Sequence, residues 1–312
     1  MIRIEKASKR YSKNEPLAVD DLELSMLDGE ILGLVGLNGA GKTTTIRMCA
    51  GITLPTSGQI LVDGYNIVEE KVKASSMVGW IPELPNFEPN AKPIPLMKYF
   101  AGYYDLRGQR EMDIINELLD SVGLSAYKNR KLRTYSQGMK KRFAIAESLL
   151  GNPKNIMFDE TLNGLDPEGV LFVRKLILKL KEEGHSILLS SHILSEVQNI
   201  ADRVAIIHHG KLLKMLTRDE MENLGVSSIK ITVDNPDKDF PHYIENFGRV
   251  ITNGNSNNAV LTDIRLVPDR IPDIVELLIK HGYRVRNFSV EGESLERYFF
   301  NLIGGENETN SL

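Results

Sequence analysis

Short, fully apolar runs alternate with longer amphipathic segments over the first two thirds of the chain. Each apolar run is too short for a buried helix and has the length of a strand that is buried on both faces. The segment from Pro167 to Gly184 repeats its apolar side chains on one helical stripe. Strands and helices in this order predict an α/β domain with a mostly parallel sheet. The predicted buried strands are Ile31–Val35, Met77–Ile81, Ile156–Phe158, Ser186–Ser190 and Val204–Ile207.

Other stretches of this region have a different pattern. Residues 2–32 alternate apolar and polar side chains, which predicts antiparallel strands that lead into the first buried strand. Five prolines between Pro82 and Pro95 predict a constrained loop without regular structure. The pattern from Leu96 to Val122 then predicts one amphipathic helix, and a further helix is expected over Gln137–Leu150.

The pattern changes again near Asn223. From there, short alternating runs and amphipathic segments follow one another in the order β-α-β-β-α-β. This order is typical of a small ferredoxin-like α+β domain. The sequence therefore predicts two domains, residues 1–222 and 223–312.

A glycine-rich loop connects the first buried strand to a predicted helix. Its backbone N–H groups and the helix N-terminus can hold a phosphate group, Lys42 adds a positive charge, and the Thr43 hydroxyl can bind Mg²⁺. A chance glycine turn would give this pattern in roughly one of a hundred such chains, so the loop predicts a nucleotide site. The predicted nucleotide-binding residues here are Gly36, Leu37, Asn38, Gly39, Ala40, Gly41, Lys42, Thr43 and Thr44.

Two carboxylates follow the buried strand at Ile156–Phe158. Asp159 ends the strand, which can lie beside the strand before the glycine-rich loop, so it can hold Mg²⁺ opposite Thr43. Glu160 stands one residue further on, where a carboxylate can orient or deprotonate an attacking water. A solvated acidic turn is the alternative interpretation of this pair.

Residues Tyr135–Met139 precede the helix that begins near Lys140, and alone they indicate only a hydroxyl-capped helix start. Their place upstream of Asp159 changes the interpretation, because the chain here resembles the nucleotide-binding subunits of ATP-binding-cassette (ABC) transporters. Tyr-Ser-Gln-Gly-Met resembles the signature motif of that family, which is usually Leu-Ser-Gly-Gly-Gln. The other matching motifs, in order, are the Walker A loop Gly36–Thr43, the Walker B segment Phe158–Glu160, the D-loop Leu165-Asp166 and the switch histidine His192.

The resemblance implies a P-loop cassette with a RecA-like, mostly parallel core, an antiparallel β subdomain and a helical subdomain at about residues 84–150. It implies an ATPase that works with Mg²⁺ as a homo- or heterodimer of cassettes, paired head to tail. Each ATP would then lie between one Walker A loop and the partner's signature motif. The residues implied are Glu160 as catalytic base, His192 on the γ-phosphate, Tyr11 on adenine, Asp166 across the interface, and Ser136, Gln137 and Gly138 on the partner's nucleotide.

Three motifs depart from the family pattern, at four positions. Glu83 replaces the loop glutamine that touches Mg²⁺, and it adds a charge while keeping an oxygen ligand. Thr161 stands where a proline usually follows the catalytic glutamate. Gln137 and Met139 differ from the common signature, so Ser136 and Gly138 are the expected contacts.

Composition narrows the choice of partners. A net charge of −4 gives no basic footprint, so no nucleic-acid partner is expected, and one cysteine excludes an internal disulfide. The sequence has no signal-peptide core and no apolar run near the ~18 residues of a membrane span. Together with the resemblance, this implies a protein peripheral to the cytoplasmic face of a membrane, bound to a separate transmembrane permease. The expected docking surface is the proline-rich loop with the aromatic residues Phe87, Tyr99, Phe100, Tyr103 and Tyr104, and a solvated loop over a core helix is the alternative interpretation.

A soluble, non-transport ABC-type ATPase acting on ribosomes or DNA is the alternative. Such relatives usually carry two cassettes in one chain or a long coiled coil, and this chain shows one cassette and no heptad run. A single cassette with an appended C-terminal domain looks more like exporter-type ATPases. The sequence does not name the cargo.

Overall fold

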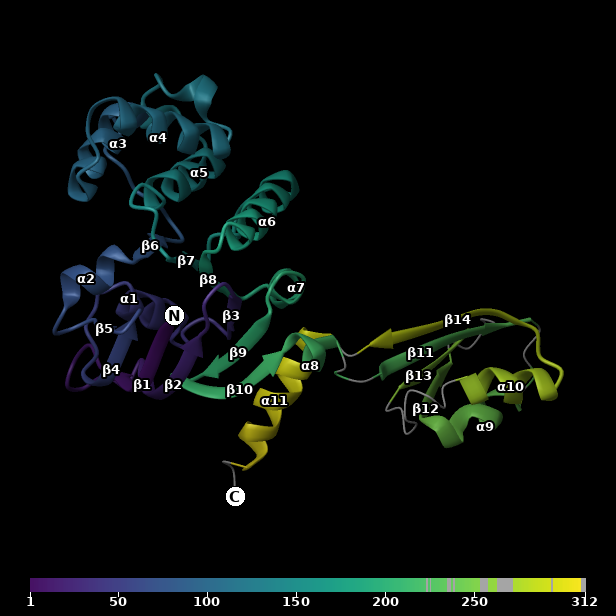
Figure 1. The fold of residues 1–312 in the computed structure, drawn as a ribbon. Coiled ribbons are helices and arrows are strands. Elements are labelled where there is room, and N and C mark those ends of the chain that lie inside the picture. Colours follow the sequence, from purple (N-terminus) through teal and green to yellow (C-terminus); the bar gives the residue numbers. More distant parts are fainter. Residues whose placement is uncertain are drawn as a thin grey trace. The chain divides into compact units, whose positions relative to one another are not determined.

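The computed structural model describes residues 1–222, 224, 226–234, 237, 239–252, 258–262, 272–292 and 294–309. The chain forms two compact units, Met1–Arg218 and Asp219–Leu312 (Figure 1). The predicted domain boundary at residue 222 coincides with the end of helix α8 (Arg218–Glu222), just inside the second unit.

A six-stranded sheet forms the centre of the first unit. Neighbouring strands of this sheet pair in parallel, except at one edge, where β10 runs antiparallel to β9. The mostly parallel sheet is confirmed, and β10 is an additional strand that the sequence pattern did not predict. In spatial order the strands are β10 (Lys211–Thr217), β9 (Arg203–His208), β3 (Ile31–Val35), β8 (Ser186–Ser191), β7 (Asn155–Asp159) and β6 (Val78–Ile81).

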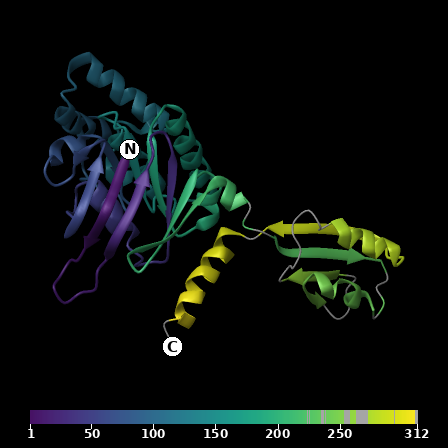
Figure 2. The same ribbon diagram turned by 60° about the horizontal axis from the view of Figure 1, so that its bottom comes forward.

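A second, antiparallel sheet holds the N-terminal strands, which run side by side in purple and blue in Figure 2. Helix α1 (Lys42–Cys49) packs between the two sheets, because Ile46 and Met48 share one core with Ile4 of the small sheet and Leu34 of the large one. This packing fixes the start of α1, and with it the glycine-rich loop. The strand order is β2 (Val19–Met26), β1 (Ile2–Lys9), β4 (Ser57–Val62) and β5 (Tyr65–Asn66).

Three helices, α3 (Pro93–Ala101), α4 (Gly108–Ser121) and α5 (Gln137–Ser148), pack together, and α5 also contacts the edge strand β6 (Figure 1). The single helix predicted over Leu96–Val122 is wrong, because Asp105 adopts the left-handed backbone conformation (φ 54°) and separates α3 from α4. The predicted proline loop also ends early, since Pro93 opens α3 at a position where a missing N–H costs nothing. The remaining helices of this unit are α2 (Lys71–Ser76), α6 (Pro167–Glu182) and α7 (Leu194–Gln198).

The described residues of the second unit follow the predicted order β-α-β-β-α-β. Their four strands form one antiparallel sheet, and apolar side chains of β11 pack with Ile244 and Ile274 of the two helices. The elements are β11 (Val226–Val233), α9 (Phe240–Ile244), β12 (Arg249–Thr252), β13 (Asn258–Thr262), α10 (Pro272–Lys280) and β14 (Val285–Gly292), followed by α11 (Leu295–Thr309).

Candidate functional site

The glycine-rich loop leaves strand β3 and enters helix α1 at Gly41. Gly41 has φ 107°, and a Cβ at this position would lie 2.5 Å from the carbonyl oxygen of Ala18. A Cβ on Gly36 would lie 2.3 Å from the carbonyl oxygen of Ile207. Only glycine fits at these two positions, and the close packing holds the loop open toward the N-terminus of α1.

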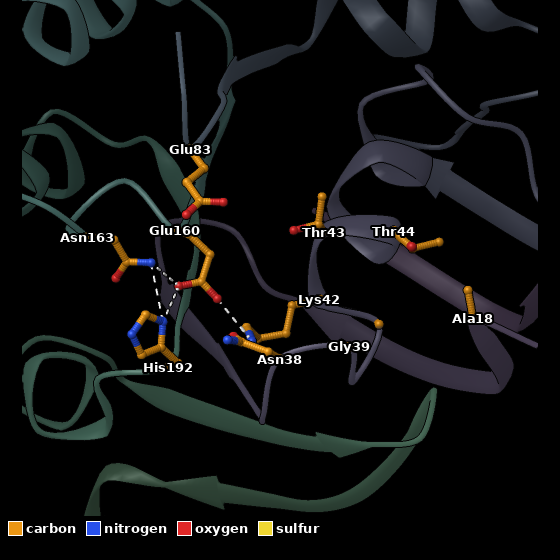
Figure 3. Close-up of a pocket in the computed structure, with 11 residues that line it drawn as sticks. Ala18, Asn38, Gly39, Lys42, Thr43, Thr44, Glu83, Glu160, Asn163 and His192 are labelled. Carbon is orange, nitrogen blue, oxygen red and sulfur yellow. Dashed lines mark hydrogen bonds and ion pairs between the residues drawn. The ribbon is translucent and has the colours of Figure 1, made fainter. Parts of the chain in front are cut away.

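A cavity of about 440 Å³ lies over this loop and α1, within the usual size range of ligand pockets. The loop's N–H groups, a helix N-terminus and one lysine make it a site for the phosphates of a nucleotide. The residues present therefore fit ATP. The lining residues are Ala18, Asn38, Gly39, Gly41, Lys42, Thr43, Thr44, Glu83, Glu160, Asn163 and His192 (Figure 3).

Lys42 is buried, and its ammonium group already has three partners. Nζ donates to the carbonyl oxygens of Gly36, at 2.8 Å, and of Leu37, at 3.2 Å. It also lies 3.0 Å from Oε1 of Glu160. The charge expected to meet the phosphates is thus paired with the carboxylate expected to act as the base.

Glu160 lies beside Lys42, Asn163 and His192, as Figure 3 shows. Its Oε2 lies 2.9 Å from Nδ1 of His192 and accepts a hydrogen bond of 2.6 Å from the side-chain amide of Asn163. Burial raises the pKa of Glu160, but the hydrogen bond and charge of Lys42, helped by Asn163 and His192, outweigh burial and hold the pKa below its usual range. Glu160 is therefore ionised.

Glu160 also has a left-handed backbone, with φ 49°. This conformation is costly for a residue with a Cβ, so the surroundings must hold it. The Glu160 N–H donates to the Ser190 hydroxyl at 3.0 Å, across the boundary between β7 and β8. The strained turn directs the side chain into the cavity.

Asp159 and Thr43 face each other beside the loop. The Thr43 hydroxyl donates to the Asp159 carboxylate at 2.9 Å, and Ser190 donates to the same oxygen at 3.1 Å. Burial raises the pKa of Asp159, and these two hydrogen bonds partly offset the shift. One carboxylate and one hydroxyl fit Mg²⁺, which takes most of its ligands from phosphates and water. Glu83 lines the same cavity from the end of β6.

Ser136, Gln137, Gly138 and Asp166 do not reach this cavity. They line a separate pocket of about 420 Å³, formed by the N-termini of α5 and α6. The Ser136 hydroxyl caps α5 by accepting from Met139 N at 3.2 Å, and the Asp166 carboxylate caps α6 by accepting from Gly169 N at 2.9 Å. Within the described residues, the predicted site is divided into two pockets on one chain.

Tyr11 lies beside Thr44, which lines the loop cavity, and is not itself one of the lining residues. Its hydroxyl is 3.3 Å from that of Thr44, and 52% of the residue is exposed. The ammonium group of Lys9 lies 5.3 Å from the ring centroid. The ring is placed beside the first turn of α1 and is open to solvent.

Two residues that contact Asp159 or Glu160 escaped the sequence analysis, Ser190 and Asn163. Ser190 could have been found, because the carboxyl ends of neighbouring parallel strands meet at one edge of a sheet. Asn163 lies between Glu160 and Asp166, so its proximity in sequence was a signal.

Comparisons with known proteins agree with this geometry. Residues 19–163 match the family described as ABC transporter. The chain is 33% identical over 306 residues to the bacitracin transport ATP-binding protein BcrA of Bacillus licheniformis, covering 98% of each chain. It is 33% identical to the ABC transporter ATP-binding protein YhcH of Bacillus subtilis, covering 93% of this chain and 92% of that one.

Solved structures show the same similarity. A structure described as an ATP-binding subunit of an ABC transporter aligns with a TM-score of 0.65 and 27% identity, covering 72% of this chain and 92% of that one. Among the described helices, none combines the length and apolar character needed to cross a membrane.

Proposed function

The chain belongs to the ABC transporter family as an ATP-binding, ATP-hydrolysing subunit, and from this premise we propose that two such cassettes, paired head to tail, use Mg-ATP to drive a separate membrane-spanning subunit. The observation that carries the proposal is the division of the site between two pockets. The first holds Lys42, Thr43 and Glu160, which fit a triphosphate and an attacking water. The second is formed by two helix N-termini with their caps, together with side chains that include Arg142 and Glu168, and no residue of the glycine-rich loop lines it.

ATP binding changes the partners of Lys42. In the structure Lys42 is paired with Glu160, whereas γ-phosphate oxygens offer it a stronger, multiply charged partner. When Lys42 turns to the phosphates, Glu160 loses the partner that does most to lower its pKa and keeps the burial that raises it. Its pKa then rises toward the range of an effective general base. Nucleotide binding thus activates the base.

The remaining residues of this pocket orient the reaction. Asn163 and His192 hold Oε2 of Glu160, so the carboxylate keeps its direction after Lys42 has left. Thr43 and Asp159, with Glu83 opposite, would hold Mg²⁺. Mg²⁺, when bound, neutralises charge on the β- and γ-phosphates. Tyr11 supplies the face on which adenine stacks.

The second pocket receives the partner's nucleotide. The first N–H groups of α5 and the positive end of its dipole attract an anion, and none of the residues that line this pocket belongs to the glycine-rich loop. A head-to-tail pair brings the partner's γ-phosphate to Ser136 and Gly138. The same pairing brings Asp166 to the interface, while its carboxylate also caps α6.

The membrane subunit docks on the exposed aromatics of the helical region. Tyr99 is 63% exposed and Tyr103 is 71% exposed on adjacent turns. Phe87 contributes less to this surface than expected, because its ring packs edge-on against Phe143 at 4.8 Å. Because ATP is supplied in the cytoplasm, the cassette works from the cytoplasmic face of the membrane.

The relatives are named as transport ATP-binding proteins, which favours transport over action on ribosomes or DNA. Purification from detergent-solubilised membranes tests this choice. Recovery of a polytopic membrane partner supports the proposal, and recovery of ribosomes or DNA would overturn it.

The second unit has no glycine-rich phosphate loop in its sequence, so it serves the exporter-type assembly as an accessory domain and does not bind ATP. A chain ending at Asn223 should therefore still bind ATP.

Replacing Glu160 by glutamine tests the catalytic assignment. The amide keeps the shape and cannot accept a proton from water, so turnover should fall about 10²–10⁴-fold. Lys42, Thr43 and Asp159 are unchanged, so ATP should still bind and hold the two chains together. Size-exclusion chromatography should show a dimer with ATP and not with ADP. A variant that stays monomeric with ATP and hydrolyses at the normal rate would refute the assignment.

A further inference from the structure

A buried lysine joins helix α5 to the turn that carries Glu160. Lys141 is only 1% exposed, although lysine is almost never fully buried without a specific partner. Its Nζ donates to the carbonyl oxygen of Thr161 at 2.8 Å and to that of Asn163. Both acceptors belong to the turn that immediately follows Glu160.

The turn needs such support. Glu160 has its left-handed backbone, and Thr161 lacks the ring that fixes φ where most family members have proline. Thr161 is fully buried, so its carbonyl oxygen has no access to water. A charged donor gives a stronger hydrogen bond to a carbonyl oxygen than a neutral one does, and Lys141 makes two such bonds.

The positive charge of Lys141 interacts with the negative charges of Glu83 and Glu160. Burial lowers its pKa, and the negative charges of Glu83 and Glu160 raise it again. The cation therefore lies close enough to both carboxylates of the ATP cavity to respond to them. Asn163, whose carbonyl oxygen Lys141 binds, donates its side-chain amide to Glu160 (Figure 3).

Resting on the proposed function, we propose that Lys141 is a positioning residue that sets the direction of Glu160 by holding the turn Glu160–Asn163 against helix α5. The same helix begins at Ser136, five residues before Lys141. One cation therefore connects the pocket that meets the partner's phosphate with the base that acts on the chain's own ATP.

Replacing Lys141 by methionine tests the proposal, because methionine keeps the length and removes the charge and the donors. Turnover should fall about 10–100-fold, the range expected when a catalytic group is misplaced by about 1 Å. The affinity of the chain's own pocket for a fluorescent ATP analogue should stay within about threefold, since no residue touching the phosphates changes. Lys140→Met, one position earlier on the same helix, is the matched control and should leave turnover within about twofold.

A double-mutant cycle separates positioning from general damage. If Lys141 acts through Glu160, then adding Lys141→Met to Glu160→Gln should cost less than about threefold more in single-turnover hydrolysis of radiolabelled ATP. Equal losses in both backgrounds would overturn the proposal, as would normal turnover of Lys141→Met or a loss of ATP affinity as large as the loss of turnover. If Lys141→Met fails to fold, Lys141→Gln, which keeps one donor, enters the same cycle. A wild-type chain without ATPase activity would instead refute the proposed function.

Discussion

The first pocket, the ATP cavity over the glycine-rich loop, has a volume of about 440 Å³. The second pocket, the signature pocket at Ser136 and Asp166, has a similar volume of about 420 Å³. The two differ in the charged groups that line them. In the ATP cavity, the Glu160 carboxylate lies within 3.0 Å of polar atoms of both Lys42 and His192. In the signature pocket, Ser136 and Asp166 bind the backbone of their own helices. In the first pocket the lysine and the carboxylate pair with each other, whereas the second is lined by Arg142, Asp166 and Glu168 beside two capped helix N-termini.

This difference in lining charges indicates that the two pockets have different functions. A cavity whose lysine and carboxylate are paired is stable without a ligand, and a phosphate must displace one partner to enter. The lining of the second pocket includes no lysine–carboxylate pair that an anion must separate, and the N-terminus of α5 favours an anion. Binding and activation therefore belong to the first pocket, and recognition of a second chain belongs to the other.

Lys42→Ala breaks the first pocket and should have the largest effect. The β- and γ-phosphates lose their compensating charge, so turnover should fall roughly 10³-fold and ATP affinity should fall with it. Steady-state hydrolysis and nucleotide titration measure the two losses. Lys73→Ala, an exposed lysine on α2, is the control. Near-normal turnover of Lys42→Ala would contradict the assignment of the cavity.

Ser136→Arg breaks the second pocket and should leave the first one intact. A long side chain at the start of α5 blocks the approach of a phosphate, so turnover should fall about 10²-fold while the chain's own ATP affinity is unchanged. Thr134→Arg, which adds the same side chain just outside the pocket lining, should have little effect. A loss of ATP affinity in Ser136→Arg would mean that the two pockets are not separate.

Mixing these two inactive variants sharpens the comparison. A mixed dimer has one composite site in which both Lys42 and the partner's Ser136 are intact. The mixture should hydrolyse ATP faster than either variant alone. Two independent sites, each complete within its own chain, would give no such gain.

Tyr11→Ala should have a smaller effect, because Tyr11 lies beside Thr44 of the first pocket and does not line the pocket itself. Loss of one stacked ring should weaken ATP binding about threefold to tenfold. Tyr11→Phe keeps the ring and removes the hydroxyl that lies 3.3 Å from that of Thr44, so its affinity should stay near wild type. Equal losses in both variants would assign the effect to the hydroxyl and not to stacking.

The sequence predicted that Asp159 faces Thr43, and the Thr43 hydroxyl donates to the Asp159 carboxylate at 2.9 Å. The expectation that β7 lies beside β3 is wrong, because β8 lies between them, and the two residues still meet because the carboxyl ends of these parallel strands share one edge of the sheet. The pattern could not predict the break at Asp105, since nothing in the apolar period marks a left-handed residue. It also missed Lys141, because burial of its side chain depends on a turn about 20 residues away in sequence.

The smallest predicted effect lies on helix α5, which carries Ser136 at its start and Glu147 near its end. In the ATP cavity, Asp159 and Glu160 both have hydrogen-bond donors, whereas burial alone raises the pKa of Glu147 to about 7. The folded state thus binds a proton more tightly than the unfolded chain, whose pKa is near 4.5. The stabilisation that protonated Glu147 contributes is fully present below the pKa of the unfolded chain. It is lost as the pH rises toward about 7, and it stays absent at higher pH.

Glu147→Gln removes this cost, so it should stabilise the protein at pH 8 by about 1–3 kcal/mol and raise the melting temperature by about 2–6 °C. The gain should vanish at about pH 4, where the wild-type carboxyl is already protonated in the folded and, largely, in the unfolded state. Glu117→Gln on the exposed face of α4 is the matched control and should shift neither melting curve. Because Glu147 lines neither pocket, turnover at pH 8 should not change. A gain of the same size at both pH values would mean that the amide improves packing and that burial of the Glu147 carboxylate carries no desolvation cost.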